Sequence, residues 1–294
     1  MTPYSINDLE KITGIKAHTI RMWEKRYQVI TPERTTTNIR YYFDKDLKRL
    51  LNISTLNKHG IKISHIVKMP ETEIREKVMQ INDHTGDYES QINSLVVSMI
   101  ELDEQAFEKV LANNILKIGF EKTVTHVLYP FLEKIGLLWQ IGTINPAQEH
   151  FIVGLIRNKI IVAIDGQEVK ASERSKTFLL FLPEKELHEL GLLFYYYLLK
   201  RNGHQVIYLG QSVPYKDLLS VLEIRKEVDY ILTYFVSALK PEEAESYIQK
   251  MSSDIPGKQI FVTGWQINNL NPVLPSNVRH VKSTEEFKAL LPSL

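Results

Sequence analysis

Residues 177–191 read TFLLFLPEKELHELG, and this stretch sets the architecture of the C-terminal half of the chain. The run from Thr177 to Leu182 is short, continuous and apolar, which predicts a parallel strand that is buried on both faces. A helical pattern follows over 187–201, so the polar residues between strand and helix are expected at the carboxyl edge of a sheet. That edge is where open α/β folds bind their ligands.

The same alternation of strand and helix continues to the C-terminus. Strands are predicted over 205–210, 230–235 and 259–263, and helices over 215–226, 241–252 and about 284–291. This order predicts a doubly wound, Rossmann-like α/β domain over residues 175–294.

Residues 89–170 carry apolar side chains at three- and four-residue spacing, which predicts a four-helix bundle. Its helices are expected over 89–100, 104–117, 120–137 and 147–164, with a kink at Pro130 in the third. Residues 71–88 are polar and charged, and we interpret them as a partly helical linker.

The first 70 residues predict a winged helix-turn-helix. Ser5 begins a short helix that Thr13-Gly14 ends, and a second helix is expected from Ala17 to Tyr27. The segment from Ile30 to Tyr42 is too rich in turn residues for a helix and predicts a two-stranded wing. The complete chain is therefore expected to be a multidomain protein of the α and α/β classes.

The charge is unevenly distributed along the chain. Residues 1–68 contain 13 of the 36 Lys and Arg residues but 6 of the 35 Asp and Glu residues, and the remainder is acidic. A basic head on an acidic body is typical of a DNA-binding domain joined to a sensor, because neutralising phosphates requires concentrated positive charge. Uneven surface charge without a function remains the alternative.

The composition excludes several classes of protein. The chain has no cysteine, which excludes a disulfide framework, a thiol nucleophile and a thiolate metal site. No apolar run approaches the roughly 18 residues of a membrane span, and the polar N-terminus is unlike a signal peptide. We therefore expect a cytoplasmic protein without membrane contact.

The stretch from Ile20 to Tyr27, with Pro32-Glu-Arg-Thr35 and Arg40-Tyr-Tyr42 after it, closely resembles the MerR family of regulators. The resemblance covers about the first 70 residues and implies binding to double-stranded DNA. The implied DNA-binding residues are Arg21, Lys25 and Arg26 on the recognition helix and Arg34, Arg40 and Tyr41 in the wing, which Tyr41 is expected to brace. Arginine suits this role because its planar donors bind guanine edges and phosphates. Trp23 is better interpreted as a core residue.

Glu186, His188 and Gly191 follow the first strand of the α/β domain at regular spacing. A lone histidine is more often structural, but Glu186 can accept a hydrogen bond from one ring nitrogen, as the partners of metal-bound histidines do. Gly191 removes a side chain where a bulky ligand would have to pass. The pattern resembles the cobalamin-binding motif Asp/Glu-x-His-x-x-Gly, which implies that His188 is the lower ligand of cobalt.

Two later motifs are compared with those of the same family. Ser237 and Leu239 stand like its Ser-x-Leu, which helps to hold the nucleotide tail of the cofactor. The family usually has Gly-Gly after the next strand. This chain keeps the second glycine, Gly264, and has Thr263 in place of the first. We therefore expect a tail pocket that is narrower or differently lined.

The predicted bundle adds Trp139, followed after nine residues by Glu149 and His150. This spacing resembles that of the CarH/LitR-type photoreceptor regulators. The resemblance implies that the tryptophan covers the upper corrin face and that the Glu-His pair contacts an adenosyl group. Ordinary packing and helix capping are the alternatives for these residues. Light-sensing members carry a histidine after the tryptophan, whereas this chain has Gln140, a poor ligand for cobalt.

The leading hypothesis is a DNA-binding repressor, without enzyme activity, whose assembly as a dimer or tetramer is controlled by adenosylcobalamin and by light. A second hypothesis keeps the regulator but treats the α/β domain as a cofactor-free module for oligomerisation or partner binding. A third is a corrinoid carrier of a methyltransferase, against which the arginines of the head argue.

Overall fold

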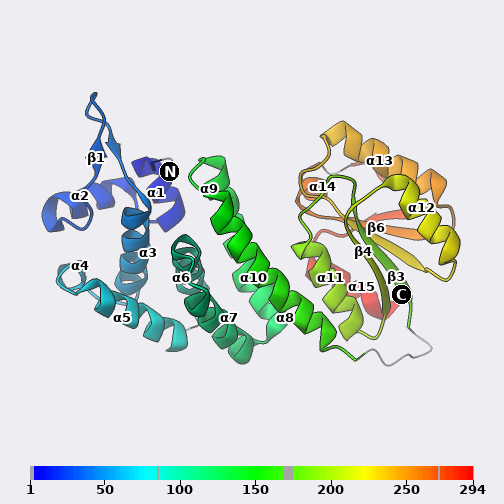
Figure 1. Ribbon diagram of the computed structural model, residues 1–294, viewed down its shortest axis with the longest axis horizontal. Coiled ribbons are helices and arrows are strands. Elements are labelled where there is room, and N and C mark those ends of the chain that lie inside the picture. Colours follow the sequence, from blue (N-terminus) through cyan, green and yellow to red (C-terminus); the bar gives the residue numbers. More distant parts are fainter. Residues whose placement is uncertain (1–2, 85, 169–174, 271, 294) are drawn as a thin grey trace. The chain divides into compact units, whose positions relative to one another are not determined.

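The N-terminal head is a winged helix-turn-helix (Figure 1). It consists of α1 (Ile6–Thr13), α2 (Ala17–Tyr27), β1 (Glu33–Arg34), β2 (Arg40–Tyr41), α3 (Asp44–Lys58) and α4 (Ile63–Ile66). The computed structural model describes residues 3–84, 86–168, 175–270 and 272–293. Ser5 caps α1, and Gly14 ends it with a φ of 72°. The two strands of the wing pair antiparallel, as predicted.

Residues 71–84, which the sequence places in a partly helical linker, form the regular helix α5 (Glu71–His84). Ile74 is fully buried and Val78 is 4% exposed, so one face of this helix belongs to the core. The helix contacts α3 of the head and α6 and α7 of the bundle. Most of its polar residues occupy the opposite face, and for that reason the segment resembles a linker in sequence.

The helical bundle has the predicted order of helices with one irregularity. It consists of α6 (Tyr88–Glu101), α7 (Glu104–Ile118), α8 (Phe120–Thr123), η1 (Val124–Leu128), α9 (Tyr129–Gln140) and α10 (Pro146–Asp165). The segment η1 is a π-helical turn, in which the N–H of Tyr129 donates to the carbonyl of Val124, five residues back. Pro130 follows at once and cannot donate a backbone hydrogen bond, so the wider turn accommodates the predicted kink.

The head and the bundle as far as residue 155 of α10 form one compact unit, Met1–Leu155, and the second unit is Ile156–Leu294. Within the first unit α3 runs antiparallel to α6, with ion pairs near both ends of the contact. Lys48 Nζ lies 2.8 Å from Glu101 Oε1 near one end, and Lys58 Nζ lies 2.9 Å from Asp87 Oδ1 near the other. The helix-turn-helix head is thus packed on the bundle of its own chain.

Asp87 connects the end of α3 to the start of α6. Its carboxylate accepts hydrogen bonds from Lys58 Nζ, from His59 Nε2 at 3.0 Å and from Ser90 Oγ at 2.6 Å. Burial alone would raise the pKa of Asp87, but the hydrogen bonds from Ser90, Lys58 and His59 outweigh it and lower the pKa to about 2. Asp87 is therefore charged throughout the neutral range.

We expect Asp87→Asn to destabilise the first unit by about 2 kcal/mol at pH 7 and by about half of that at pH 3. The folded-state pKa lies below the ordinary value, so the stabilisation is complete above pH 4 and is lost as the pH falls towards 2. In a protein whose Trp139 and Trp265 are replaced by Phe, urea unfolding followed by the fluorescence of the buried Trp23 measures both differences. If the free energies of unfolding of wild type and variant differ by the same amount at pH 7 and at pH 3, the lowered pKa of Asp87 is contradicted.

The second unit contains the predicted α/β domain. Its elements are β3 (Thr177–Pro183), α11 (Leu190–Arg201), β4 (Gln205–Val213), α12 (Tyr215–Ile224), β5 (Tyr230–Tyr234), α13 (Pro241–Asp254), β6 (Gln259–Thr263), α14 (Trp265–Leu270), β7 (Val278–His280), α15 (Thr284–Leu290) and η2 (Leu291–Ser293). The parallel sheet has the order β4-β3-β5-β6-β7, so the chain changes direction between β3 and β5. Helix α14 and strand β7 were not predicted, and α11 begins at Leu190 rather than at residue 187.

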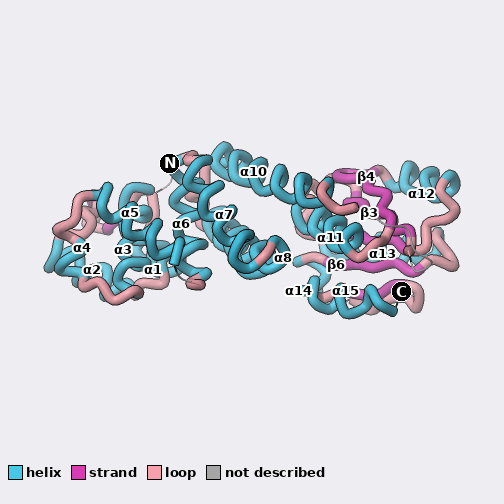
Figure 2. The backbone as a smooth tube through the Cα atoms, turned by 90° about the horizontal axis from the view of Figure 1, so that it is seen from below, coloured by secondary structure: helices cyan, strands magenta, loops and turns pink. Residues whose placement is uncertain are grey.

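Alternate residues of the strands pack on opposite faces of this sheet. Phe178, Leu180 and Leu182 face α11 and α15, whereas Leu179 and Phe181 face α12 and α13. The tube view shows the strands at the centre of the unit with helices around them (Figure 2). The doubly wound fold is confirmed, and its switch point between β3 and β5 is where such folds bind ligands. None of the described helices combines the length and apolar character of a membrane span.

Candidate functional site

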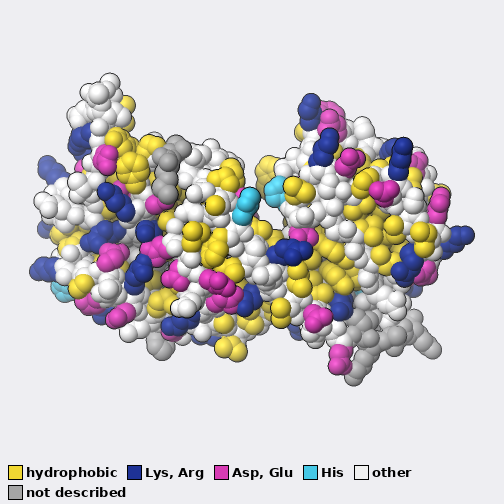
Figure 3. Space-filling view, in the orientation of Figure 1, with side chains coloured by type: hydrophobic (Ala, Val, Ile, Leu, Met, Phe, Trp, Pro, Cys, Tyr) yellow, Lys and Arg dark blue, Asp and Glu magenta, His cyan; other side chains and the backbone are white. Residues whose placement is uncertain are grey.

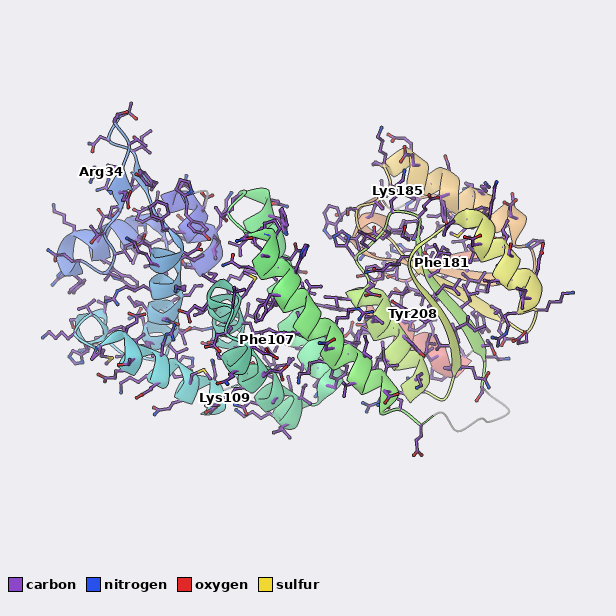
Figure 4. All side chains as sticks on the ribbon, viewed as in Figure 1. Arg34, Phe107, Lys109, Phe181, Lys185 and Tyr208 are labelled. Carbon is purple, nitrogen blue, oxygen red and sulfur yellow. The ribbon has the colours of Figure 1, made fainter. Side chains whose placement is uncertain are left out.

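Glu186 organises the loop that follows β3 at the carboxyl edge of the sheet. Figure 4 labels Lys185, the residue directly before it. The side chain of Glu186 is 2% exposed. One carboxylate oxygen, Oε1, accepts from His188 Nδ1 at 2.6 Å and from the N–H groups of Leu187 and His188 at 3.1 and 3.2 Å. The other, Oε2, accepts from the N–H groups of residues 236–238 at 2.9–3.1 Å. A single buried carboxylate thus joins the loops that follow β3 and β5.

The charge of Glu186 determines the tautomer of His188. Burial alone would raise the pKa of Glu186, but hydrogen bonds from the His188 ring and from the N–H groups of Ser237 and Val236 outweigh it and lower the pKa to about 2. An ionised carboxylate only accepts hydrogen bonds, so the His188 nitrogen beside it, Nδ1, must carry the proton. In the neutral ring Nε2 then carries the lone pair, which is the arrangement found in metal-bound histidines.

The donor set suits a metal that brings most of its own ligands. In the described part of the chain, no group of three or more His, Cys, Asp or Glu side chains is placed to hold a metal ion. The His188 side chain is 57% exposed at the switch point of the sheet. One oriented imidazole there fits the cobalt of a corrinoid, because the corrin ring supplies four nitrogen ligands.

The two predicted glycines are both packed against neighbours. A Cβ built on Gly191 would lie 2.7 Å from Cε2 and 2.8 Å from the hydroxyl of Tyr234. Gly264 has a φ of +109°, and its Cβ would meet the carbonyl oxygen of Phe235 and lie 2.8 Å from the nitrogen of the same residue. The sequence explains Gly191 by the passage of a ligand, whereas in the structure the ring of Tyr234 takes that space.

Ser237, Leu239 and Thr263 lie at the same edge of the sheet. The backbone of Ser237 is held by Glu186, and Leu239 is partly buried against the hydrophobic core. Thr263, in place of a glycine, is 2% exposed. Its hydroxyl donates to the carbonyl of Val281 at 2.6 Å and lies 3.3 Å from the Tyr195 hydroxyl. These residues occupy one edge, as predicted, and their role towards a nucleotide tail stays a prediction.

In the first unit, Trp139, Glu149 and His150 lie at one end of the bundle. Trp139 is the penultimate residue of α9 and is 44% exposed, and the other two lie in the first turns of α10. The neighbouring Gln148 is buried, and its side chain donates to the carbonyl of Ile100 at 2.9 Å, which anchors the start of α10. An exposed Trp is not explained by core packing, which was its alternative interpretation.

The recognition helix of the head has the predicted polarity. Arg21, Lys25 and Arg26 are exposed on α2, while Ile20 and Trp23 are buried, so Trp23 is a core residue. The space-filling view shows Lys and Arg side chains spread over the visible face of the head, and Figure 4 marks Arg34 on the wing (Figures 3 and 4). This surface is suited to the phosphates of DNA.

The wing residues differ in what they contact. Arg34 is exposed and donates from Nη1 to Asn38 at 2.7 Å. Tyr41 donates to Glu33 across the hairpin at 2.9 Å, which is the bracing contact that the sequence suggests. Arg40 instead pairs with Glu24 of α2, at 3.1 Å from Nε to Oε1. Arg40 therefore fixes the wing to the recognition helix, and a phosphate contact by Arg40 stays a prediction.

Sequence reasoning missed Glu189, the residue directly after His188. Its side chain is 8% exposed and accepts from Arg157 Nε at 2.5 Å and from the Tyr208 hydroxyl at 2.8 Å. Burial and the hydrogen bond to Glu189 raise the pKa of Tyr208. The contacts tie α10 and β4 to the start of α11, and the only signal in the sequence was an acidic residue beside an apolar helix face.

Comparisons with known proteins agree with this arrangement. Residues 4–72 match the family described as MerR HTH family regulatory protein, and residues 91–163 match the B12 binding domain. The chain is 28% identical over 292 residues to the HTH-type transcriptional repressor CarH of Myxococcus xanthus, covering 96% of each chain. It is 25% identical over 288 residues to the repressor CarA of the same organism, covering 97% of this chain and 95% of CarA.

The fold of about two thirds of the chain is shared with a solved structure. The monomethylamine corrinoid protein of Methanosarcina barkeri superposes with a TM-score of 0.50 at 15% sequence identity. The match covers 67% of this chain and 95% of that protein. A helical part followed by a doubly wound α/β domain is thus a known combination.

Proposed function

We propose that the chain, whose two parts match the MerR HTH family and the B12 binding domain, is a MerR-type regulator that represses transcription under the control of adenosylcobalamin. As a cobalamin-dependent DNA-binding regulator, it needs a DNA surface and a cofactor site on one chain. The hydrogen bond from His188 Nδ1 to the buried carboxylate of Glu186 carries the proposal for the cofactor site. It prepares the imidazole for cobalt before any cofactor is bound.

The proposed roles of the site residues divide between the two units. His188 would bind the cobalt, with Glu186 as its positioning residue, and Ser237, Leu239 and Gly264 would line the edge of the sheet beside it. Trp139, Glu149 and His150 belong to the upper side of the cofactor. Gln140 leaves that side without a histidine next to Trp139, so no second imidazole is expected there.

The proposed signal is light. The cobalt–carbon bond of adenosylcobalamin is cleaved by green or blue light, and this is the chemistry that the cofactor supplies when bound. The residues of the chain would bind and orient the cofactor. The end of the bundle that carries Trp139 would respond when the cofactor loses its adenosyl group. A ligand that binds one assembly state better than the other shifts the population between them.

Four further properties belong to the same proposal. The active form is a homo-oligomer, either a dimer or a tetramer, because paired half-sites on DNA require paired heads. The protein acts in the cytoplasm and has no enzyme activity of its own. The partner is double-stranded DNA, bound through the exposed arginines of α2 and of the wing.

The test uses the full chain, adenosylcobalamin, and a duplex selected from a random library for binding to the protein. We expect the cofactor, added in the dark, to change its visible spectrum, to lower the elution volume of the protein and to tighten DNA binding about tenfold. Green light should reverse the last two effects. The measurements are absorption, size-exclusion chromatography and fluorescence anisotropy of labelled DNA.

The variant Arg21→Ala separates the two functions. It should bind adenosylcobalamin like the wild type but bind DNA at least about tenfold more weakly. A wild-type protein that stays colourless with excess cofactor yet binds DNA would refute the cofactor proposal and favour a cofactor-free module. A protein that binds the cofactor but no DNA would favour the corrinoid carrier.

A further inference from the structure

The ring of Tyr234 fills the space that the missing side chain of Gly191 leaves open. A Cβ at Gly191 would lie 2.7 Å from Cε2 and 2.8 Å from the hydroxyl oxygen of Tyr234, both far inside van der Waals contact. The glycine therefore allows the aromatic ring to approach the backbone of α11. No family pattern noted in the sequence includes this tyrosine.

Tyr234 lies close to Glu186, the hydrogen-bond partner of the candidate cobalt ligand His188. It is the last residue of β5, and it shares the sheet face of Leu232 that packs towards α11. Glu186 holds the backbone of residues 236–238, which follow Tyr234 almost at once. Burial and the nearby charge of Glu186 raise the pKa of Tyr234 to about 12, so its hydroxyl is neutral at physiological pH.

The chemistry of cobalamin requires free space at this position. In solution the lower position of cobalt is held by the base of the cofactor's own nucleotide tail. If His188 were the cobalt ligand, the displaced base would need a space of its own near His188. Gly191 is three residues further along the chain and has no side chain, so the slot for the base is expected over it.

The aromatic residues around this slot are not equally fixed. Tyr195 is 2% exposed, its hydroxyl lies 3.3 Å from Thr263 Oγ1, and its ring meets Phe287 edge-on at 5.0 Å between centroids. Tyr234 is partly exposed, and within the described part of the chain its hydroxyl makes no hydrogen bond. Turning the Tyr234 ring away therefore breaks no hydrogen bond, whereas moving Tyr195 or Thr263 does.

We propose that Tyr234 is a gate for the nucleotide tail: its ring occupies the tail slot over Gly191 and must turn away before a tailed corrinoid can bind through His188. The inference rests on the proposed function. If the ring leaves the slot only part of the time, the apparent affinity for a tailed corrinoid equals the intrinsic affinity multiplied by the fraction of time that the slot is open. A corrinoid without the tail does not need the slot and escapes this reduction.

The test compares adenosylcobalamin with adenosylcobinamide, which lacks the nucleotide tail, in the dark. For a slot open about a tenth of the time, Tyr234→Ala lowers the dissociation constant of adenosylcobalamin about tenfold and leaves that of adenosylcobinamide within about twofold. Tyr234→Phe keeps the ring and should match the wild type. Absorption titrations give the dissociation constants, and stopped-flow mixing shows whether association of the tailed corrinoid becomes faster.

The control is Tyr230→Ala, on the same strand and the same face but at the other end of β5, where its ring stacks on Phe178 at 4.9 Å. This variant should leave both dissociation constants unchanged. An equal change for both corrinoids in Tyr234→Ala, or no change for adenosylcobalamin, would overturn the gate. Should circular dichroism show that Tyr234→Ala is unfolded, Tyr234→Val decides instead, since valine suits a strand. If neither corrinoid binds the wild type, the proposed function itself fails.

Discussion

His188→Ala should abolish the spectral change on adding adenosylcobalamin and weaken its binding at least about a hundredfold, because it removes the cobalt ligand. Glu186→Gln should fall between the variant and the wild type, about tenfold weaker, because the amide no longer fixes the tautomer of His188. The neutral imidazole then samples both tautomers, and one of them presents a protonated nitrogen to cobalt. Absorption titration in the dark measures both losses.

His65→Ala is the matched control for this experiment. His65 is exposed on α4 of the head, far along the chain from the site, so its loss should leave cobalamin binding unchanged. Without cofactor, the His188→Ala protein should bind DNA as the wild type does, because α2 and the wing are intact. If His188→Ala binds adenosylcobalamin with the wild-type spectrum and affinity, another group is the lower ligand and the assignment is wrong.

Local patterns in the sequence were sufficient for most of the fold. The apolar run from Thr177 to Leu182 predicted β3, and helical spacing predicted the helices of the bundle. Strand β7 has three residues, and α14 follows Gly264 directly; neither is long enough for its periodicity to be recognised. Strand β7 depends on pairing with β6, and α14 depends on packing against β6. Neither contact can be recognised from a short stretch of sequence.

The start of α11 illustrates the same limit. The sequence pattern allows a helix from residue 187, but the structure begins it at Leu190. Glu186 binds the N–H groups of residues 236–238, some fifty positions later, and thereby keeps the loop around His188 out of the helix. A contact between residues so far apart in sequence cannot be predicted from either segment alone.

The candidate sites show which roles need long-range information. His188 and Arg21 were predicted from their own motifs, and the structure places His188 at the sheet edge and Arg21 on an exposed helix face. Arg40 was expected to face DNA, but its partner Glu24 lies sixteen residues earlier on α2. The ring of Tyr234 against Gly191 is a contact of the same kind. Motifs thus indicate the chemistry of a site, whereas partners and packing need the fold.

Gly264→Ala should unfold or severely destabilise the α/β domain, at a cost of about 4 kcal/mol, whether or not a cofactor is present. The φ of +109° is strained for any residue with a Cβ, which accounts for about 1–2 kcal/mol. The added Cβ would also lie 2.8 and 2.9 Å from the nitrogen and carbonyl carbon of Phe235. That backbone cannot move freely, because its N–H donates to the carbonyl of Thr263 at 2.9 Å. Forcing it aside adds a further cost of about 1–3 kcal/mol.

Gly257→Ala isolates the close contact from the backbone strain. Gly257 also has a positive φ, +81°, but nothing lies within 4 Å of its Cβ position, so only the strain of about 1 kcal/mol is expected. Hydrogen exchange measured by mass spectrometry should show loss of protection in β3, β5 and β6 of Gly264→Ala but not in the head. Equal effects of the two substitutions would show that the contact with Phe235 is unimportant. A large difference would mean that this glycine is required by the fold itself, so that its presence in the sequence does not by itself indicate a bound nucleotide tail.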